Sequence, residues 1–214
     1  DLILFPRYNV FRKKGETVTT ELTLGLGFKI PLGSYNDSAA RIEPFSGNTY
    51  YITKPLSVQP SSGANDLIFY SFYYRGYKCD ILRLFANAIY IKKGWSPTGE
   101  KMGDFASIGL FAGKTFRCKL SGTAMFRGEW VGKTEVNEDI LMYTALSYDP
   151  AATGSKKVFA GLQLGYNPFD GMMIYASTEY PLYQYVTKSQ IASHLQVMAG
   201  ISYRFMIKKE KKVE

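Results

Sequence analysis

The sequence contains a single histidine, His194, and only two cysteines, Cys79 and Cys118. No nucleophile motif such as G-x-S-x-G accompanies His194, and no spacing of His, Cys, Asp and Glu matches a metal ligand set. We therefore predict that the protein is not an enzyme and has no catalytic residue, metal or cofactor. His194 is interpreted as a solvated histidine at a strand end, and a membrane-embedded hydrolase would depend on it alone.

Long apolar runs are also missing. No run reaches the eighteen apolar residues that a transmembrane helix needs, so no such helix is expected. The 26 Lys and Arg outnumber the 18 Asp and Glu, but the basic residues are scattered and no recognition motif is present, so no nucleic-acid partner is expected. The two cysteines are expected about 9–10 Å apart, beyond the reach of a disulfide, and two free thiols are predicted.

What the sequence has instead is alternation between apolar and polar or small residues. In residues 195–205 the odd positions are apolar, from Leu195 to Phe205, and the even positions carry Gln, Met, Gly, Ser and Arg. A period of two places successive side chains on opposite faces of a strand. One face suits hydrocarbon and the other does not, which is the pattern of a transmembrane β-barrel strand.

The same alternation predicts nine strands, at residues 2–11, 20–32, 66–76, 80–92, 104–114, 119–131, 157–167, 172–184 and 194–207. A tilted strand crosses a bilayer in about 9–11 residues. A soluble sandwich or lipocalin-like barrel also alternates, but its polar face would be rich in Lys, Glu and Asp. Here that face is mixed, with Gly, Ser, Thr, Asn, Gln and several Arg. We therefore predict an all-β, transmembrane, antiparallel up-and-down β-barrel.

The lengths of the connections predict the orientation. Short turns are expected at residues 75–78, 114–118 and 167–171, and longer connections at 33–65, 93–103, 132–156 and 185–193. Outer-membrane barrels have short periplasmic turns and long outer loops, so the C-terminus is expected in the periplasm of a Gram-negative cell. The strand-like segment 140–150 is interpreted as an extension of the barrel wall above the membrane.

The number of strands bears on completeness. Bacterial single-chain barrels have an even number of strands, so we expect at least one more strand upstream of the nine. The alternative is a closed barrel of ten strands that counts residues 140–150, which would break the alternation of short and long connections. Residues 1–207 are assigned to the barrel domain and residues 208–214 to a charged periplasmic tail.

The charges assigned to the lumen form the main set of candidate site residues. The alternation places inward Arg7, Glu21, Lys29, Arg75, Arg83, Arg127, Glu129, Glu179 and Arg204. Six bases against three acids could favour anions in the lumen. Alternatively, Arg–Glu pairs brace a narrow, filled barrel. Arg127, Glu129 and Glu179 are predicted to form a cluster across the lumen.

The aromatic residues are assigned to both faces. Those predicted to face lipid are Tyr70, Phe72, Tyr74, Tyr90, Trp130, Tyr166, Tyr180 and Tyr203. Those predicted to face the lumen are Phe69, Tyr73, Phe85, Phe105, Phe111, Phe159 and Tyr175. Of these, Phe85, Phe111 and Tyr175 join the lumen candidates. An apolar ligand pocket and plain lumen packing both explain inward aromatics.

Five segments carry a family resemblance when taken in order. They are LGLGFKIPLG at 24–33, LFANAIY at 84–90, GLQLGYNP at 161–168, YPLYQYV at 180–186 and AGISYRF at 199–205. Together they resemble the MetA-pathway of phenol degradation family of outer-membrane transporters, over most of residues 1–205. The resemblance implies a barrel of about twelve strands that passes small, often hydrophobic molecules, with no catalytic residues to carry over. The segment 132–156 and the lysine-rich tail depart from the family.

These patterns lead to two hypotheses about function. The first is an outer-membrane transporter or channel for small hydrophobic or aromatic molecules. The second is a non-conducting structural or accessory barrel in a larger outer-membrane complex. The expected partners are outer-membrane lipid, a small hydrophobic substrate and other outer-membrane proteins.

Overall fold

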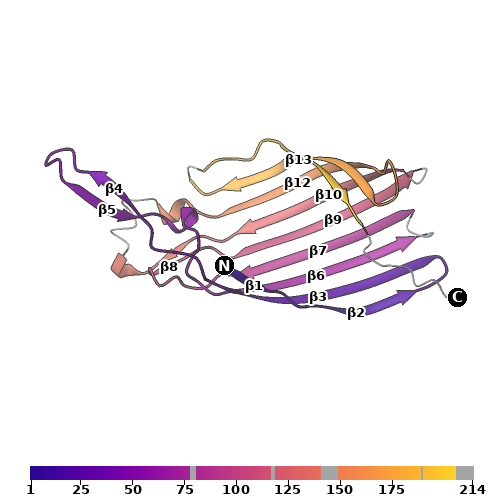
Figure 1. The fold of residues 1–214 in the computed structure, drawn as a ribbon, viewed down its shortest axis with the longest axis horizontal. Coiled ribbons are helices and arrows are strands. Elements are labelled where there is room, and N and C mark those ends of the chain that lie inside the picture. The colour runs from indigo at the N-terminus through magenta and orange to yellow at the C-terminus, as the bar shows by residue number, and fades with distance from the viewer. Residues whose placement is uncertain (78–80, 117–118, 141–148, 189, 206–214) are drawn as a thin grey trace.

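One large antiparallel sheet dominates the computed structural model, which describes residues 1–77, 81–116, 119–140, 149–188 and 190–205 (Figure 1). Strand accounts for 63% of the described residues. The sheet has ten strands, which are β1 (Leu2–Leu4), β2 (Arg7–Lys14), β3 (Val18–Ile30), β6 (Asp66–Tyr77), β7 (Leu82–Lys92), β9 (Phe105–Phe116), β10 (Leu120–Val131), β12 (Ser155–Tyr166), β13 (Met172–Val186) and β14 (Gln196–Tyr203). Each strand of the sheet pairs with the next one along the chain, except that β1 and β2 both pair with β3, and this is an up-and-down topology.

The nine predicted strands all correspond to strands of this sheet, so the all-β antiparallel prediction is confirmed. The predicted strand at 2–11 is divided into β1 and β2, and both segments pair with β3. The division falls at Pro6, which has no backbone N–H for the ladder. Within the described residues β14 pairs only with β13, and β1 and β2 pair only with β3. The sheet is therefore open rather than a closed barrel.

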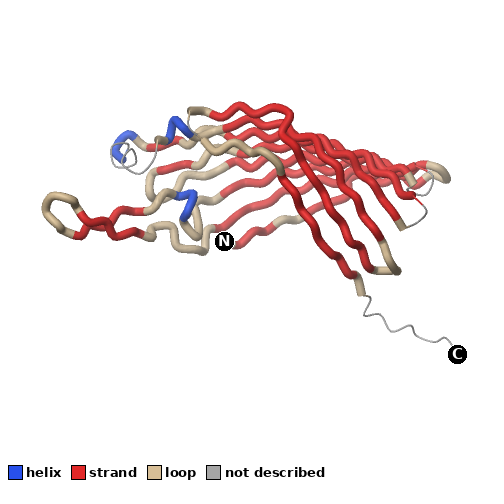
Figure 2. The backbone as a smooth tube through the Cα atoms, turned by 90° about the horizontal axis from the view of Figure 1, so that it is seen from above, coloured by secondary structure: helices blue, strands red, loops and turns tan. Residues whose placement is uncertain are grey.

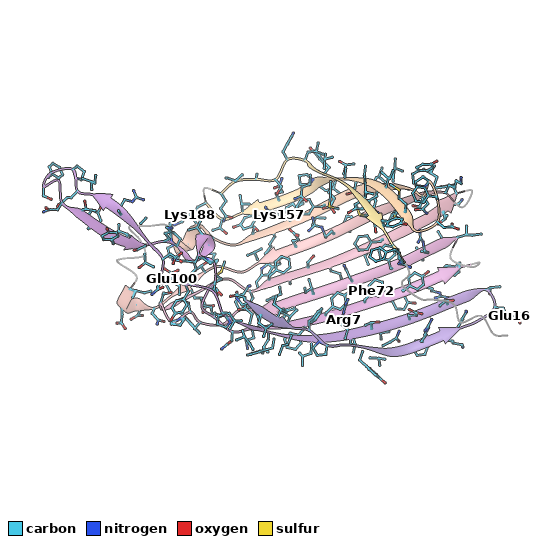
Figure 3. The ribbon with its side chains drawn as sticks, in the orientation of Figure 1. Arg7, Glu16, Phe72, Glu100, Lys157 and Lys188 are labelled. Carbon is cyan, nitrogen blue, oxygen red and sulfur yellow. The ribbon has the colours of Figure 1, made fainter. Side chains whose placement is uncertain are left out.

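The connections differ in length at the two ends of the sheet. At one end lie the long connections, which carry the hairpin of β4 (Ser38–Ile42) and β5 (Thr49–Thr53) and the pair of β8 (Glu100–Lys101) and β11 (Glu135–Val136). Three short helical turns, Leu56–Val58, Glu138–Ile140 and Pro150–Ala152, also belong to these connections. Figure 3 shows Glu16 in a tight turn at the opposite end from Glu100 and Lys188.

Three predictions fall on residues outside the described part of the chain. They concern the thiols Cys79 and Cys118, most of the segment 140–150, and the tail 208–214. The described ends of the segment 140–150 are helical turns, at Ile140 and Pro150.

The cross-strand register assigns every strand residue to one of two faces, because directly paired residues point to the same side of a sheet. One face carries the large apolar side chains and is exposed, as Leu162 at 61% and Val197 at 71% illustrate. We call it the apolar face. The other, the polar face, is more covered and contains Phe159, which is 1% exposed. The alternation thus predicts the faces correctly for most strands.

For β6 the predicted faces are wrong. The register puts Tyr73 opposite Leu22 and Ala86, and Arg75 opposite Leu84, all on the apolar face. The residues that must move to the apolar face are Phe69, Tyr73 and Arg75, and those that move to the polar face are Tyr70, Phe72 and Tyr74. Aromatic side chains occupy both parities of this strand, so hydrophobicity could not distinguish its faces, and only pairing with β3 and β7 does.

The sheet curves toward its polar face. Arg127 on β10 reaches Gln196 on β14 at 3.5 Å from Nη2 to Oε1, although β12 and β13 lie between them. On a flat sheet three strand spacings would separate the two backbones by about 14 Å. Figure 2 shows a strongly curved sheet. The polar face is therefore the inner, concave side.

We expect Phe159→Ala to lower the free energy of unfolding by about 3–5 kcal/mol, because this side chain is fully covered on the polar face. The matched control Phe45→Ala removes a ring that is 98% exposed, and should change stability by less than about 0.5 kcal/mol. Urea unfolding followed by tryptophan fluorescence measures both. Equal effects of the two substitutions would contradict the packing described for the polar face.

Candidate functional site

The polar face carries an ion cluster built from two strands, β10 and β13. Arg127 on β10 pairs through Nη1 with Glu129 of the same strand and through Nη2 with Glu179 on β13. The three side chains are between 20% and 24% exposed. The structure thus brings together the three residues that the sequence predicts to cluster. The positive charge of Arg127 is shared between two carboxylates, which leaves the cluster with excess negative charge.

An aromatic ring packs against the arginine of this cluster. The Arg127 guanidinium carbon lies 4.7 Å from the centroid of the Phe159 ring. Phe159 on β12 is paired directly with Arg127 on one side and with Pro181 on the other. The register shifts between Val158 and Phe159, because a bulge accommodates Pro181, which cannot donate to the ladder. Stacking on a covered ring fixes the guanidinium in place.

A second group of aromatic side chains lies on the polar face of β6, β7 and β9. Phe85 and Phe111 stack with ring centroids 4.7 Å apart and planes 6° from parallel. Phe72 lies next to Phe85, at 6.3 Å between centroids. Both candidates Phe85 and Phe111 therefore belong to one apolar patch on the inner side of the sheet. Such a patch can contact an apolar ligand or simply fill space.

Glycines make room for rings elsewhere on this face. A Cβ on Gly200 of β14 would lie 2.6 Å from the ring of the candidate residue Tyr175, its direct partner on β13. A Cβ on Gly27 of β3 would lie 2.7 Å from the ring of Phe5. These rings pack over glycines of the neighbouring strand. The inner face is therefore densely filled, and the strands keep their normal spacing.

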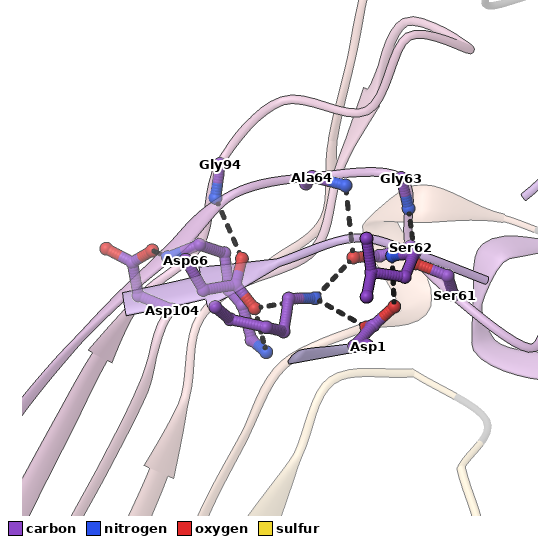
Figure 4. A network of polar contacts seen from close by, with 11 residues as sticks. Asp1, Ser61, Ser62, Gly63, Ala64, Asp66, Gly94 and Asp104 are labelled. Atoms are coloured by element: carbon purple, nitrogen blue, oxygen red, sulfur yellow. Dashed lines mark hydrogen bonds and ion pairs between the residues drawn. The ribbon is translucent and has the colours of Figure 1, made fainter. Parts of the chain in front are cut away.

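A polar network closes the long-loop end of the sheet (Figure 4). The Asp66 carboxylate, 2% exposed, accepts from Lys29 Nζ at 3.0 Å and from Lys93 Nζ at 3.0 Å. It also accepts from the backbone N–H of Gly94 at 3.2 Å. Lys29 in addition contacts Ser62 Oγ at 2.8 Å and Asp1 Oδ2 at 3.4 Å. Through the Asp66 carboxylate, the candidate Lys29 thus connects β3 with the start of β6 and with Lys93, which follows β7.

The remaining candidates lie apart from these clusters. Glu21 pairs with Arg12 Nε at 2.8 Å, and Arg7 lies over the Phe5 ring at 5.6 Å. Arg83 donates to Thr115 Oγ1 at 3.3 Å. One prediction of an inward position fails, because Arg75 lies on the apolar face beside Tyr77. Arg204 lies beyond the end of β14 and is exposed, so the strand register does not assign it to a face. His194 is exposed next to Tyr180, also outside the strand.

The sequence interpretation missed Asp66, Lys93 and Asp104. Burial opposes the charge of the Asp104 carboxylate, but hydrogen bonds from Tyr90 Oη at 2.7 Å and the Lys93 backbone N–H at 2.8 Å outweigh it and lower the pKa of Asp104. The direct pairing of Lys29 with Asp66 could have revealed part of this network once the register of β3 and β6 was known.

Other chemistry finds little support in the described residues. They contain no group of three or more His, Cys, Asp or Glu that could hold a metal ion. No helix in the described part of the chain is long and apolar enough to cross a membrane. The polar face instead carries paired charges and stacked rings.

Comparison with known proteins gives no further identification. No family model matches the chain, and no curated protein or solved structure matches it either. The resemblance to the MetA-pathway of phenol degradation family stays a prediction.

We expect a double-mutant cycle of Arg127→Met and Glu179→Gln to give a coupling energy of about 1–3 kcal/mol, because the pair is largely covered and bridges two strands. The control cycle, Arg12→Met with Glu21→Gln, tests a pair whose arginine is 66% exposed, and should give at most about 0.5 kcal/mol. Urea unfolding of the single and double variants measures both energies. Equal coupling in the two cycles would contradict a structural role for the Arg127 cluster.

Proposed function

We propose that this chain forms the wall of a transmembrane β-barrel in a Gram-negative outer membrane, and that the barrel passes small hydrophobic or aromatic molecules. The apolar face carries the proposal. Its large side chains are exposed across the sheet, as Leu26, Ile108, Leu164 and Ile201 illustrate at 56%, 57%, 63% and 68%. A soluble protein rarely exposes an apolar patch of this extent, whereas lipid covers it without cost.

The charges of the two faces support the same proposal. In the described strands of the large sheet, no Asp or Glu lies on the apolar face. The cations of that face are Lys13, Arg75, Lys92, Lys114 and Lys156, each no more than two residues from a strand end. On a lipid-facing surface, charge is tolerated near the interfaces and costly at the middle. By contrast, Arg127 and Glu179 lie well inside their strands on the polar face.

In a bilayer the two open edges must be paired, because unpaired backbone groups in hydrocarbon cost several kcal/mol each. We propose that further strands join β14 to β1 and β2, in a barrel of about twelve strands. The aromatic patch of Phe72, Phe85 and Phe111 would then line the lumen and contact an apolar substrate. The end with tight turns would be periplasmic.

A second function, a non-conducting accessory barrel, is favoured by one specific observation. The β4–β5 hairpin projects away from the sheet and exposes apolar side chains, with Ile42 at 70%, Phe45 at 98% and Tyr51 at 73% (Figure 1). Such a hairpin could contact another protein of an outer-membrane complex.

Uptake by liposomes tests the transport proposal. Vesicles containing the full-length protein should take up an aromatic probe that a lipid bilayer itself excludes, such as benzenesulfonate, with a saturable rate above that of protein-free vesicles. Phe85→Ala, on the polar face, should change that rate several-fold, because it removes half of the stacked pair. The control Leu84→Ala alters the adjacent apolar-face residue and should leave the rate unchanged.

Uptake equal to that of protein-free vesicles would contradict transport. The same negative result, together with a partner protein that co-purifies at fixed stoichiometry, would support the accessory role instead.

A further inference from the structure

A row of aromatic side chains crosses the apolar face near the long-loop end. Residues paired directly across six strands share this row, and they are Phe69, Tyr90, Ala106, Trp130, Lys156 and Tyr185. Aromatic rings of this kind gather where a bilayer meets water. Tyr90 directs its hydroxyl to Asp104, which precedes β9, and this matches an interfacial position with one apolar and one wet end.

The next row of residues on the apolar face, toward the middle of the sheet, lines a groove. Its floor contains the small residues Ser71, Ala88 and Gly128, with Ile108 between Ala88 and Gly128 in the same row. The lining follows consecutive residues of neighbouring strands, and each run of three residues begins and ends on the apolar face, as residues 128–130 and 156–158 do. The groove therefore opens on that face. Its volume is about 840 Å³, within the range of sites that hold small apolar ligands.

A lysine with no ion pair lies at one rim of the groove. Lys156 lines the groove beside Trp130, its direct partner on β10, and has no carboxylate partner in the described residues. The adjacent Lys157 lies on the polar face and donates to Ser193 at 3.2 Å. The Asp104 carboxylate accepts hydrogen bonds from the Tyr90 hydroxyl and from the Lys93 backbone N–H rather than from Lys156. The rim thus presents positive charge directly above an apolar groove.

We propose that this groove binds an anionic membrane lipid, with one acyl chain along Ser71, Ala88 and Gly128 and the phosphate of its headgroup against Lys156. The proposal rests on the membrane position given under the proposed function. The aromatic row marks the level of the membrane interface, so the apolar surface on its membrane side lies at the depth of the lipid acyl chains. A lysine in the row lies at the depth of the headgroups, and its positive charge attracts an anionic one. A zwitterionic lipid such as phosphatidylcholine also carries a phosphate, but its own ammonium group offsets the negative charge that Lys156 would meet.

Native mass spectrometry of the detergent-solubilised full-length protein, titrated with phosphatidylglycerol or phosphatidylcholine, tests the proposal. The unaltered protein should bind phosphatidylglycerol about fivefold more tightly, the factor expected for one lysine near an anionic headgroup. Lys156→Gln should remove this preference. Gly128→Leu should weaken binding of both lipids, because it fills the groove.

Matched controls exist on the same face. A Cβ on Gly128 approaches nothing nearer than Ile108 at 3.6 Å, and one on Gly122 nothing nearer than Phe116 at 3.7 Å, so both glycines accept a side chain without backbone strain. Gly122→Leu and Lys114→Gln, at the tight-turn end of the face, should leave lipid binding unchanged.

The failures of the two proposals are distinguishable. A protein that inserts into vesicles but shows no preference for phosphatidylglycerol, or whose binding is unchanged by Lys156→Gln and Gly128→Leu, overturns the lipid site alone. A protein that stays soluble without detergent and does not enter vesicles overturns both the lipid site and the proposed membrane function.

Discussion

The cross-strand hydrogen-bond register decides the chemistry of this sheet, because a shift of one residue would exchange the two faces of a strand. With the observed register, the apolar residues of neighbouring strands form one continuous surface, and the arginines, carboxylates and glycines form the other. The contacts within the sheet that build the site follow from this separation. The Arg127 cluster, the stacked Phe85–Phe111 pair and the cover of Tyr175 over Gly200 all require that their strands keep these pairings.

Curvature toward the polar face links this register to the site. It brings Arg127 within reach of Glu179 and Gln196, and it covers Phe159 beneath the guanidinium. The same curvature spreads the apolar side chains apart, which leaves shallow grooves where small residues such as Ala88 and Gly128 occur. A filled inner side and a grooved outer side are therefore two consequences of one geometry. In a bilayer the first would restrict passage and the second would contact lipid.

Most of the fold follows from local alternation in the sequence, which locates the strands and the cluster of Arg127, Glu129 and Glu179. Alternation fails in β6, where aromatic residues occupy both odd and even positions. The two faces of this strand can be assigned only from its pairing with β3 and β7, and for this reason the predicted face of Arg75 is wrong. The Asp66 network depends on loop residues such as Lys93 and Gly94, whose positions no periodicity specifies. Local alternation also cannot predict whether the edges of the sheet are paired, because closure of a barrel depends on strands far apart in the sequence.

The central claim is that the apolar face contacts lipid. Nitroxide labels on single cysteines at Thr123, Ala124, Met125 and Phe126 of β10, in full-length protein from which Cys79 and Cys118 have been replaced, test it most directly in a bilayer. Collisions with oxygen, which is concentrated in the membrane, should be frequent at Ala124 and Phe126 and rare at Thr123 and Met125. Equal oxygen contact at all four positions, or frequent contact of Ala124 and Phe126 with a water-soluble nickel chelate, would contradict the account.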